Sequence, residues 1–343
     1  MRRLQQKLIL LIVSSALCVF YFHNKWRQHH ILPGSLYNND NMASMAMFSW
    51  LSWDSGESQN KQVVTRYSYL DSQERRKANI RLVCEREDLI NSSFVLDLKV
   101  AAQLYVEHSH KFIYCEVPKV GCSNWKRIIL LLNESFDLSA DELKHYQVHA
   151  SQQLIKLSSY PPSLQKELLA NYTKVMFTRD PIERVVSAFR DKFLHEDDVY
   201  YSKTFANIIR RALNIHSETN ITFEQFAQFI IRENPSYRDT HWRPMYQLCD
   251  PCNIQYDFIG KFETLAQDAD FVLKTIGAPE NLKYPTIKHH SNESRTGDDT
   301  TISYLEMLSP ILFRKFMNIY SLDFSMFEYS YYSSSVSKLP KTA

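Results

Sequence analysis

The chain contains very little glycine. Only 6 of its 343 residues are glycine, a scarcity that argues against collagen-like, linker-rich and propeller architectures. The sequence also lacks internal repeats and low-complexity tracts. Aromatic residues are plentiful, with 20 Tyr, 20 Phe and 5 Trp within a hydrophobic content of 44%. This content is enough for one large hydrophobic core or two small ones.

An excess of charge of one sign is also missing. The 40 basic and 38 acidic side chains leave a formal net charge of only +2. A protein that binds nucleic acid in bulk usually has a stronger and more clustered basic excess, so we expect no nucleic-acid partner. Any anionic ligand must instead be held by a local group of basic residues.

Long uncharged apolar runs are absent except near the N-terminus, where Leu8–Phe22 carries no charge. The run is short for a plasma-membrane span but adequate for a thin bilayer. A cleaved signal peptide is the alternative, but cleavage near Ala16 would leave an apolar new terminus exposed. We therefore predict a cytosolic tail at 1–7 and a transmembrane signal anchor at 8–24. Three basic residues precede the run and two follow it, which favours a lumenal body in the type II arrangement.

Five Asn-x-Ser/Thr triplets agree with a lumenal body, although such triplets also arise by chance. The candidate glycosylation sites are Asn91, Asn133, Asn171, Asn220 and Asn292.

The cysteines lack the pattern of a zinc site. Cys249 and Cys252 form a CxxC pair, but a second CxxC or CxxH pair is missing. We therefore predict no metal and expect disulfides, as is usual in an oxidising lumen. Because Cys18 lies in the apolar run, five cysteines remain. That number is odd, so at least one thiol should stay free.

The rest of the chain divides into a stem and one folded body. Residues 31–75 are polar and show no helical or alternating periodicity, so we assign 25–75 to a flexible stem and 76–335 to a lumenal domain. Strands alternate with helices in this domain, which predicts an α/β fold with a mainly parallel sheet flanked by helices. The expected strands are 111–117, 174–178 and 256–261, and the expected helices are 72–87, 125–132, 182–193, 223–232 and 265–276.

The segment that follows the first expected strand has the layout of an anion site. A helix N-terminus offers unpaired N–H groups and partial positive charge, and Lys119 begins the loop before such a helix. Gly121 lets the backbone approach a ligand closely, and Ser123 adds a hydroxyl group. A lysine in a turn is, however, often merely solvated. The loop does not match the pattern GxxxxGK[ST], which argues against a nucleotide kinase.

A second strand–turn–helix segment places Arg179 at the end of a strand, where open α/β sheets bind ligands. Ser187 lies about two turns into the following helix, which Asp180 as N-cap and Pro181 should begin. An arginine fork with a hydroxyl group suits a phosphate. The alternative is that Arg179 only pairs with Asp180 or Glu183 while Ser187 packs. Two anion sites at strand ends suit a donor that is charged at both its 3′ and 5′ ends.

At these motifs the chain resembles the membrane-bound carbohydrate sulfotransferases. The similarity extends over about residues 78–330 and includes the branch of chondroitin 4-O- and HNK-1 sulfotransferases. The motifs that carry it are YCEVPKVGCSNWKR (Tyr114–Arg127), TRDPIERVVSAFRDKF (Thr178–Phe193), HWRPMYQLCDPC (His241–Cys252), YDFIGKFET (Tyr256–Thr264) and LDFSMFEYS (Leu322–Ser330).

The resemblance implies a P-loop-like sulfotransferase fold and 3′-phosphoadenylyl sulfate (PAPS) as the donor, without a metal. Lys119 would be catalytic, and Arg179 with Ser187 would hold the 3′-phosphate. The implied cofactor-binding residues are Pro118, Lys119, Val120, Gly121, Cys122, Ser123, Asn124, Trp125, Arg179 and Ser187.

A sugar hydroxyl group has a high pKa, so its attack needs a base. His149 is the expected base, because related enzymes carry a histidine in a comparable segment, and Glu116 is a rival. His241 and Trp242 are candidates for acceptor binding, although Trp242 could equally belong to the core. The polar loop at 295–297 either closes over the cofactor or is an ordinary loop.

The expected function is PAPS-dependent sulfation of a glycan, with the 4-OH of GalNAc in chondroitin or dermatan as acceptor. Other acceptors are a terminal glucuronate of an HNK-1-type glycan and GalNAc of N-glycans. An inactive lumenal glycan-binding protein is a more distant alternative. We expect a single-pass type II protein of the Golgi membrane, and the sequence leaves a homodimer open.

Overall fold

The computed structural model describes residues 57–93, 95–132, 140, 142–195, 198–216, 219–287 and 294–331. The expected anchor at 8–24 and two candidate glycosylation sites, Asn133 and Asn292, lie outside these residues. No helix within the described residues is long and apolar enough to cross a membrane. The chain divides into two units, residues 1–64 and 65–343, and the sheet belongs to the second.

The described sheet contains four strands in the order β1-β2-β3-β4. Strands β2, β3 and β4 are parallel, while β1 pairs with β2 in antiparallel fashion. The three parallel strands are those predicted, because each is a short apolar run that is buried on both faces. The antiparallel edge strand was not predicted. The strands are β1 (Leu104–Glu107), β2 (Phe112–Cys115), β3 (Thr173–Thr178) and β4 (Phe258–Lys261).

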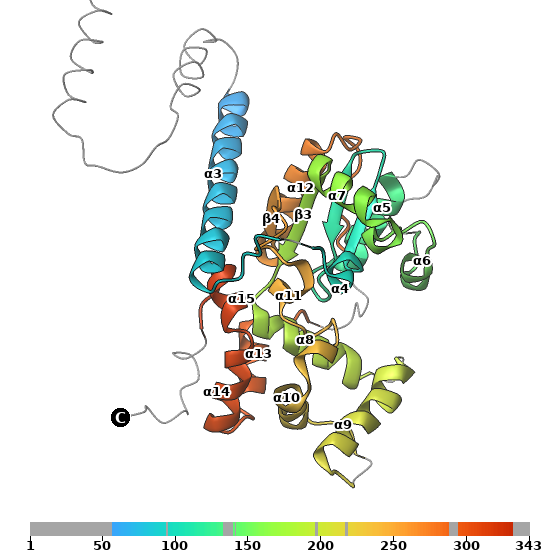
Figure 1. Cartoon of the computed structure of the whole chain (residues 1–343), viewed down its shortest axis with the longest axis vertical. Helices are drawn as coiled ribbons and strands as arrows, with labels where there is room; N and C mark the ends of the chain where they lie inside the picture. The colour runs from blue at the N-terminus through green and yellow to red at the C-terminus, as the bar shows by residue number, and fades with distance from the viewer. Residues whose placement is uncertain are drawn as a thin grey trace, which may run out of the picture. The chain divides into compact units, whose positions relative to one another are not determined.

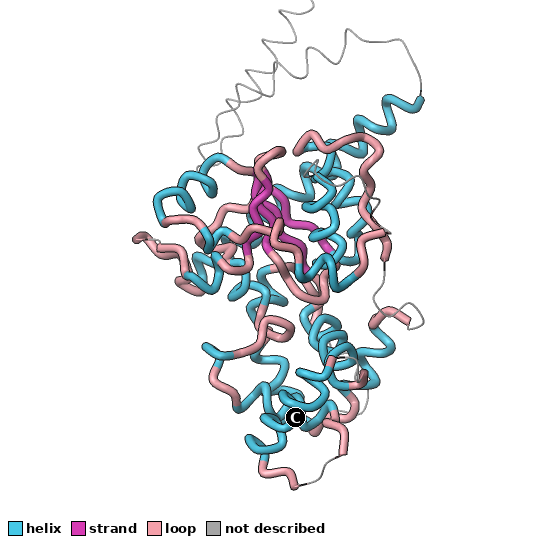
Figure 2. Tube along the Cα trace, turned by 90° about the vertical axis from the view of Figure 1, so that its right-hand side faces the viewer, coloured by secondary structure: helices cyan, strands magenta, loops and turns pink. Residues whose placement is uncertain are grey.

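Helices surround the sheet and also form a separate layer. In Figure 1, α5, α7 and α12 lie beside the strands, and α8, α9, α10 and α14 gather at the other end of the second unit. Figure 2 shows the same division between a half that contains the strands and a half made of helices and loops. The longer helices are α3 (Glu57–Arg86), α5 (Cys122–Leu132), α7 (Pro162–Asn171), α8 (Pro181–Phe193), α9 (Ala206–Leu213), α10 (Phe223–Arg232), α12 (Leu265–Thr275), α13 (Asp298–Leu305) and α14 (Pro310–Ile319). The shorter ones are α4 (Leu98–Ala101), α6 (His145–Ala150), α11 (Met245–Cys249), α15 (Ser321–Met326), η1 (Leu157–Ser159), η2 (Tyr200–Phe205), η3 (Pro235–Tyr237) and η4 (Phe262–Thr264).

Helix α3 begins 15 residues earlier than the expected helix at 72–87, at Glu57. Within the segment assigned to the stem, Gln73 is buried and pairs with both main-chain groups of Ile259. Its amide donates to Ile259 O (3.3 Å), and its Oε1 accepts from Ile259 N (2.9 Å). Arg76 Nη1 donates to the same carbonyl at 2.6 Å. Side chains of α3 therefore satisfy the open edge of β4, as a neighbouring strand otherwise would.

The layer of helices has an aromatic core of its own. Helix α8 begins as predicted, because the Asp180 carboxylate accepts hydrogen bonds from the N–H groups of Ile182 and Glu183, both at 2.9 Å. Its apolar face joins α10 and α14 in a cluster that contains Trp242. The Trp242 ring lies 5.1 Å from the ring of Phe226 and has no exposed surface.

The motif LDFSMFEYS supports a short helix next to the disulfide region. The buried carboxylate of Asp323, on α15, accepts hydrogen bonds from the N–H groups of Met245 (2.7 Å) and Tyr246 (2.9 Å) at the start of α11. Burial raises the pKa of this carboxyl group to about 6. The C-terminal motif therefore has a structural role, since it caps the helix that ends at Cys249.

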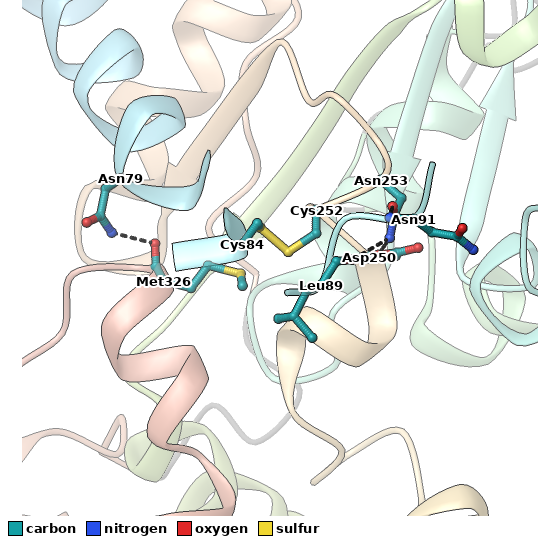
Figure 3. The surroundings of a disulfide bond; sticks show 8 residues. All are labelled: Asn79, Cys84, Leu89, Asn91, Asp250, Cys252, Asn253 and Met326. Carbon is teal, nitrogen blue, oxygen red and sulfur yellow. Dashed lines mark hydrogen bonds between the residues drawn. A yellow bond between two sulfur atoms is a disulfide. The ribbon is translucent and has the colours of Figure 1, made fainter. Parts of the chain in front are cut away.

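Two disulfides confirm the expected use of the cysteines. The CxxC pair is split between them, because Cys84 bonds to Cys252 and Cys115 bonds to Cys249. Figure 3 shows the first bond, which attaches the end of α3 to the loop after α11. The second attaches β2 to α11. Cys122 is the free thiol among the described cysteines.

The candidate glycosylation sites within the described residues are all exposed, namely Asn91, Asn171 and Asn220. Their occupancy stays a prediction.

We predict that Cys249→Ser lowers the free energy of unfolding by about 2–5 kcal/mol, the usual cost of losing a native disulfide. Peptide mapping without reduction should recover Cys84 with Cys252 and Cys115 with Cys249, and alkylation before reduction should label Cys122. A peptide in which Cys249 is bonded to Cys252 would contradict this structure.

Candidate active site

A cleft of about 1240 Å³ opens at the carboxyl ends of β2 and β3, the edge at which parallel sheets bind ligands. Its walls come from the loop after β2, the start of α5, helix α6, the far half of α8, η4 with the start of α12, and loops at 284–287 and 294–296. The predicted site residues that line it are Pro118, Lys119, Gly121, Cys122, Ser123, Asn124, His149, Arg179, Ser187 and His241. The cleft therefore brings together two motifs that are separated by about sixty residues in the chain.

The loop between β2 and α5 has an unusual backbone. Lys119 and Gly121 both have positive φ values, of 70° and 79°. Alternation of this kind turns successive N–H groups toward one point and can form an anion-binding nest. The N–H groups of Asn124 and Trp125 donate to Gly121 O at 3.0 and 3.2 Å. The amide groups before them are thus the candidates for an anionic ligand.

Lys119 lies in an ion-pair network that the sequence analysis did not identify. Its Nζ is 3.3 Å from Asp191 Oδ2, and the same oxygen is 3.2 Å from Lys192 Nζ. Burial lowers the pKa of Lys119, while Asp191 opposes that effect. Burial acts to raise the pKa of Asp191, but the two lysines outweigh it and hold the carboxylate ionised. Asp191 follows Ser187 by one helical turn, so helical spacing could have placed it at the site.

Arg179 lines the cleft and also forms the ion pair with Glu183 that was its alternative role. Its side chain is 3% exposed in the ion pair with Glu183, at 3.3 Å. Its Nη1 also donates to Lys119 O (3.1 Å), and its Nη2 donates to Thr296 O. Arg190 Nη1 donates to Thr296 Oγ1 at 2.9 Å. Ser187, on α8, lines the cleft together with both arginines.

Arg184, on the same helix, is fully buried and bonds to main-chain carbonyl groups of two loops. Its Nη1 donates to Pro118 O (3.4 Å) and His241 O (3.0 Å), and its Nη2 donates to Arg243 O. The loop that carries Lys119 and the loop that carries His241 are therefore held by one guanidinium group.

His149, on α6, belongs to a chain of polar contacts that runs from Glu116 through Lys126 to Ser123. Glu116 Oε1 pairs with Lys126 Nζ at 2.5 Å. Lys126 Nζ lies 3.3 Å from His149 Nδ1, and His149 Nε2 lies 2.9 Å from Ser123 Oγ. Burial and then the charge of Lys126 lower the pKa of His149 to about 3, so the imidazole is neutral. Glu116, the rival base, is occupied by Lys126 and is not among the residues of the cleft.

Two tryptophans among the predicted site residues, Trp125 and Trp242, lie in the core. The side chain of Val120 is buried as well, but the contact predicted for this residue is its main-chain amide. Val120 and Trp125 have no exposed surface, and Trp125 stacks on Tyr114 with a ring distance of 5.5 Å. Trp242 is equally buried, and its Nε1 donates to Glu233 at 3.1 Å. Both indole rings pack against other aromatic rings, so in this structure neither stacks on a nucleotide or a sugar.

The fold and cleft define an α/β protein in which two motifs with basic side chains meet at one sheet edge. The chain belongs to the sulfotransferase family, whose model matches residues 102–330. Among curated proteins it is 38% identical over 269 residues to carbohydrate sulfotransferase 9 of Homo sapiens, a match covering 76% of this chain and 60% of that one. Carbohydrate sulfotransferase 8 of Mus musculus is 37% identical over 269 residues, covering 76% and 64%. Carbohydrate sulfotransferase 11 of Rattus norvegicus is 36% identical over 247 residues, covering 68% of each chain.

The match spans a little under two thirds of the length of the first two relatives. No solved structure matches the chain.

We predict that Gly121→Ala destabilises the protein more than Gly277→Ala does. Both glycines have positive φ, which costs an alanine about 1–2 kcal/mol. A Cβ at Gly121 would also lie 2.4 Å from Tyr284 Oη and 3.0 Å from Leu265 Cδ2, whereas nothing lies within 4 Å of one at Gly277. Overpacking of this kind adds about 1–3 kcal/mol. Chemical unfolding of both variants measures the difference, and equal losses would contradict the close approach at Gly121.

Proposed function

We propose that the chain transfers a sulfuryl group from PAPS to a hydroxyl group of a glycan. The observation that carries the proposal is the convergence of the Lys119 loop and the Arg179–Ser187 segment on one cleft. A donor with a 5′-phosphosulfate and a 3′-phosphate needs two anion sites in one cavity. Membership of the sulfotransferase family and similarity to proteins named carbohydrate sulfotransferases support this donor and this class of acceptor.

The residues present fit such a donor. The cleft has ample volume for a nucleotide. Lys119 and the amide groups at the start of α5 would hold the 5′-phosphosulfate. Ser187, with Arg179 and the neighbouring Arg190, would hold the 3′-phosphate. When bound, PAPS supplies an activated sulfuryl group whose leaving group is a phosphate.

Lys119 is the residue we assign to charge stabilisation. Negative charge grows on the oxygen that departs with the nucleotide, and a fixed ammonium group beside it lowers the barrier. Asp191 keeps the Lys119 ammonium inside the cleft at 3.3 Å. Because Lys192 shares that carboxylate, Lys119 can turn toward a ligand without leaving Asp191 unpaired.

We propose the 4-OH of GalNAc in chondroitin or dermatan as the acceptor. This assignment rests on the resemblance of the segments at 241–252 and 322–330 to chondroitin 4-O-sulfotransferases. A terminal glucuronate of an HNK-1-type glycan and GalNAc of N-glycans are the alternatives.

We further propose a lumenal Golgi location behind the anchor at 8–24. Two disulfides favour an oxidising compartment, and exposed sequons suit a lumenal body.

The test is sulfate transfer by the purified full-length chain, with labelled PAPS and a panel of desulfated glycans. We expect incorporation into chondroitin. Lys119→Ala should lower kcat/KM by about 10²–10³-fold, because it removes a group that stabilises developing charge. Lys166→Ala is the matched control, since Lys166 is exposed on α7 and does not line the cleft. It should leave the rate unchanged.

Failure to bind the product nucleotide PAP would overturn the sulfotransferase assignment. Binding of PAP without transfer to any glycan of the panel would contradict the proposed acceptors. Transfer to an N-glycan or an HNK-1-type glycan, but not to chondroitin, would favour the corresponding alternative.

A further inference from the structure

His241 has the contacts of a general base. Its Nδ1 lies 2.8 Å from Asp239 Oδ1, and its main-chain N–H donates to the same oxygen at 2.8 Å. Tyr201 donates its hydroxyl hydrogen to Asp239 Oδ2 at 2.8 Å. The His241 side chain is 23% exposed and lines the cleft. No residue in the described part of the chain forms a hydrogen bond with its Nε2.

These contacts determine which ring nitrogen carries the proton. A carboxylate only accepts hydrogen bonds, so His241 Nδ1 must be the N–H that donates to Asp239. In the neutral ring Nε2 then keeps its lone pair, and this is the atom that is left for a ligand. The pairing of a carboxylate with Nδ1–H is the arrangement that orients a histidine as a base in hydrolytic triads.

The main chain at His241 is also held close to the loop that carries Lys119. Arg184 Nη1 contacts both Pro118 O and His241 O, so the two carbonyl oxygens are no farther apart than these two hydrogen bonds allow. A second connection runs through α8, because Lys192 Nζ lies 5.0 Å from the centre of the Tyr201 ring. The charged and titratable groups around His241 include Asp239 in its own turn, Tyr201 on η2, whose hydroxyl group lies 3.1 Å from Nδ1, and Arg184 and Lys192 on α8. The charge of Arg243 also acts on Asp239.

His149, the expected base, has the opposite tautomer. Lys126 is held as an ammonium by Glu116, and an ammonium only donates hydrogen bonds. His149 Nδ1 must therefore accept from Lys126 (3.3 Å), and Nε2–H must donate to Ser123 Oγ (2.9 Å). Neither nitrogen is left to take a proton from a substrate. These contacts suit a residue that orients the Ser123 hydroxyl group.

We propose that His241, oriented by Asp239, is the base that accepts the proton of the acceptor hydroxyl group, and that His149 is a positioning residue for Ser123. The inference rests on the proposed function. As the acceptor oxygen forms its bond to sulfur, the bond between sulfur and the phosphate oxygen of the donor breaks. The hydroxyl proton moves to His241 Nε2, and the departing phosphate oxygen leaves with the bonding electron pair as an anion beside Lys119.

The first test needs neither donor nor acceptor. Nitrogen-15 NMR of the histidine side chains in the free full-length chain distinguishes the two neutral tautomers. We expect Nδ1–H for His241 and Nε2–H for His149, with assignments made from His241→Asn and His149→Asn. An Nε2–H tautomer at His241 would overturn the proposal, whatever the chain catalyses.

The second test compares variants in sulfate transfer. His241→Asn keeps an amide N–H for Asp239 but has no basic nitrogen, so kcat should fall by about 10²–10⁴-fold with PAP affinity unchanged. The acidic limb of the pH profile of kcat should disappear with it. In His241→Gly, added imidazole should restore part of the rate. Asp239→Asn should lower kcat while leaving KM for the donor unchanged, because it favours the wrong tautomer.

His149→Asn should weaken PAP binding and keep the acidic limb. His108→Asn is the control, because His108 is exposed between Tyr160 and Tyr172 and lies outside the cleft. A wild-type chain without activity would speak against the proposed function alone. An active chain in which His241→Asn retains its rate, or in which only His149→Asn removes the acidic limb, would overturn the assignment of the base.

Discussion

The candidate active-site cleft depends on buried arginines of one strand–helix unit that bond to main-chain carbonyl groups. A guanidinium group out of water is costly unless its donors are satisfied. Arg184 satisfies its two Nη groups with carbonyls of the loops at 118 and 241–243, although its Nε has no hydrogen-bond partner among the described residues. Arg179 bonds to the carbonyls of Lys119 and Thr296. The loops are fixed in turn, because their irregular backbone needs partners that secondary structure does not provide. The position of α8 and the positions of the cleft loops are thus coupled through these two side chains.

The same helix also sets the electrostatics of the cleft. Beyond its arginines it presents Ser187, Asp191 and Lys192, each on the side that faces the Lys119 loop. Asp191 contacts two lysines, Lys119 and Lys192. Because one carboxylate neutralises only one ammonium group, a local positive charge remains in the cleft, although the net charge of the chain is only +2. A local field of this kind can bind an anion without making the whole surface basic. The disulfide between Cys115 and Cys249 attaches the carboxyl end of β2 to α11.

Much of the fold could be predicted, because strongly apolar runs leave few alternatives. Strands β2, β3 and β4, and helices α8, α10 and α12, all have clear hydrophobic patterns and appear close to their expected bounds. Strand β1 did not stand out, because it is short and fully buried and so lacks alternation. The early part of α3 was assigned to a stem because its sequence is polar. It is helical, and Gln73 and Arg76 find their partners on β4, some 180 residues away, where no local pattern could reveal them.

The sequence by itself identified the candidate donor-binding residues, since the Lys119 loop and the Arg179–Ser187 segment are local motifs whose side chains and turn geometry are set within a few residues. It also showed that the cysteines form disulfides, although not their pairing. Only the tertiary structure decided which aromatic residues are buried, which histidine has a free nitrogen, and that Asp191 lies beside Lys119. These properties depend on contacts between distant segments, and a histidine's proton is placed by whichever carboxylate or ammonium the fold brings to it.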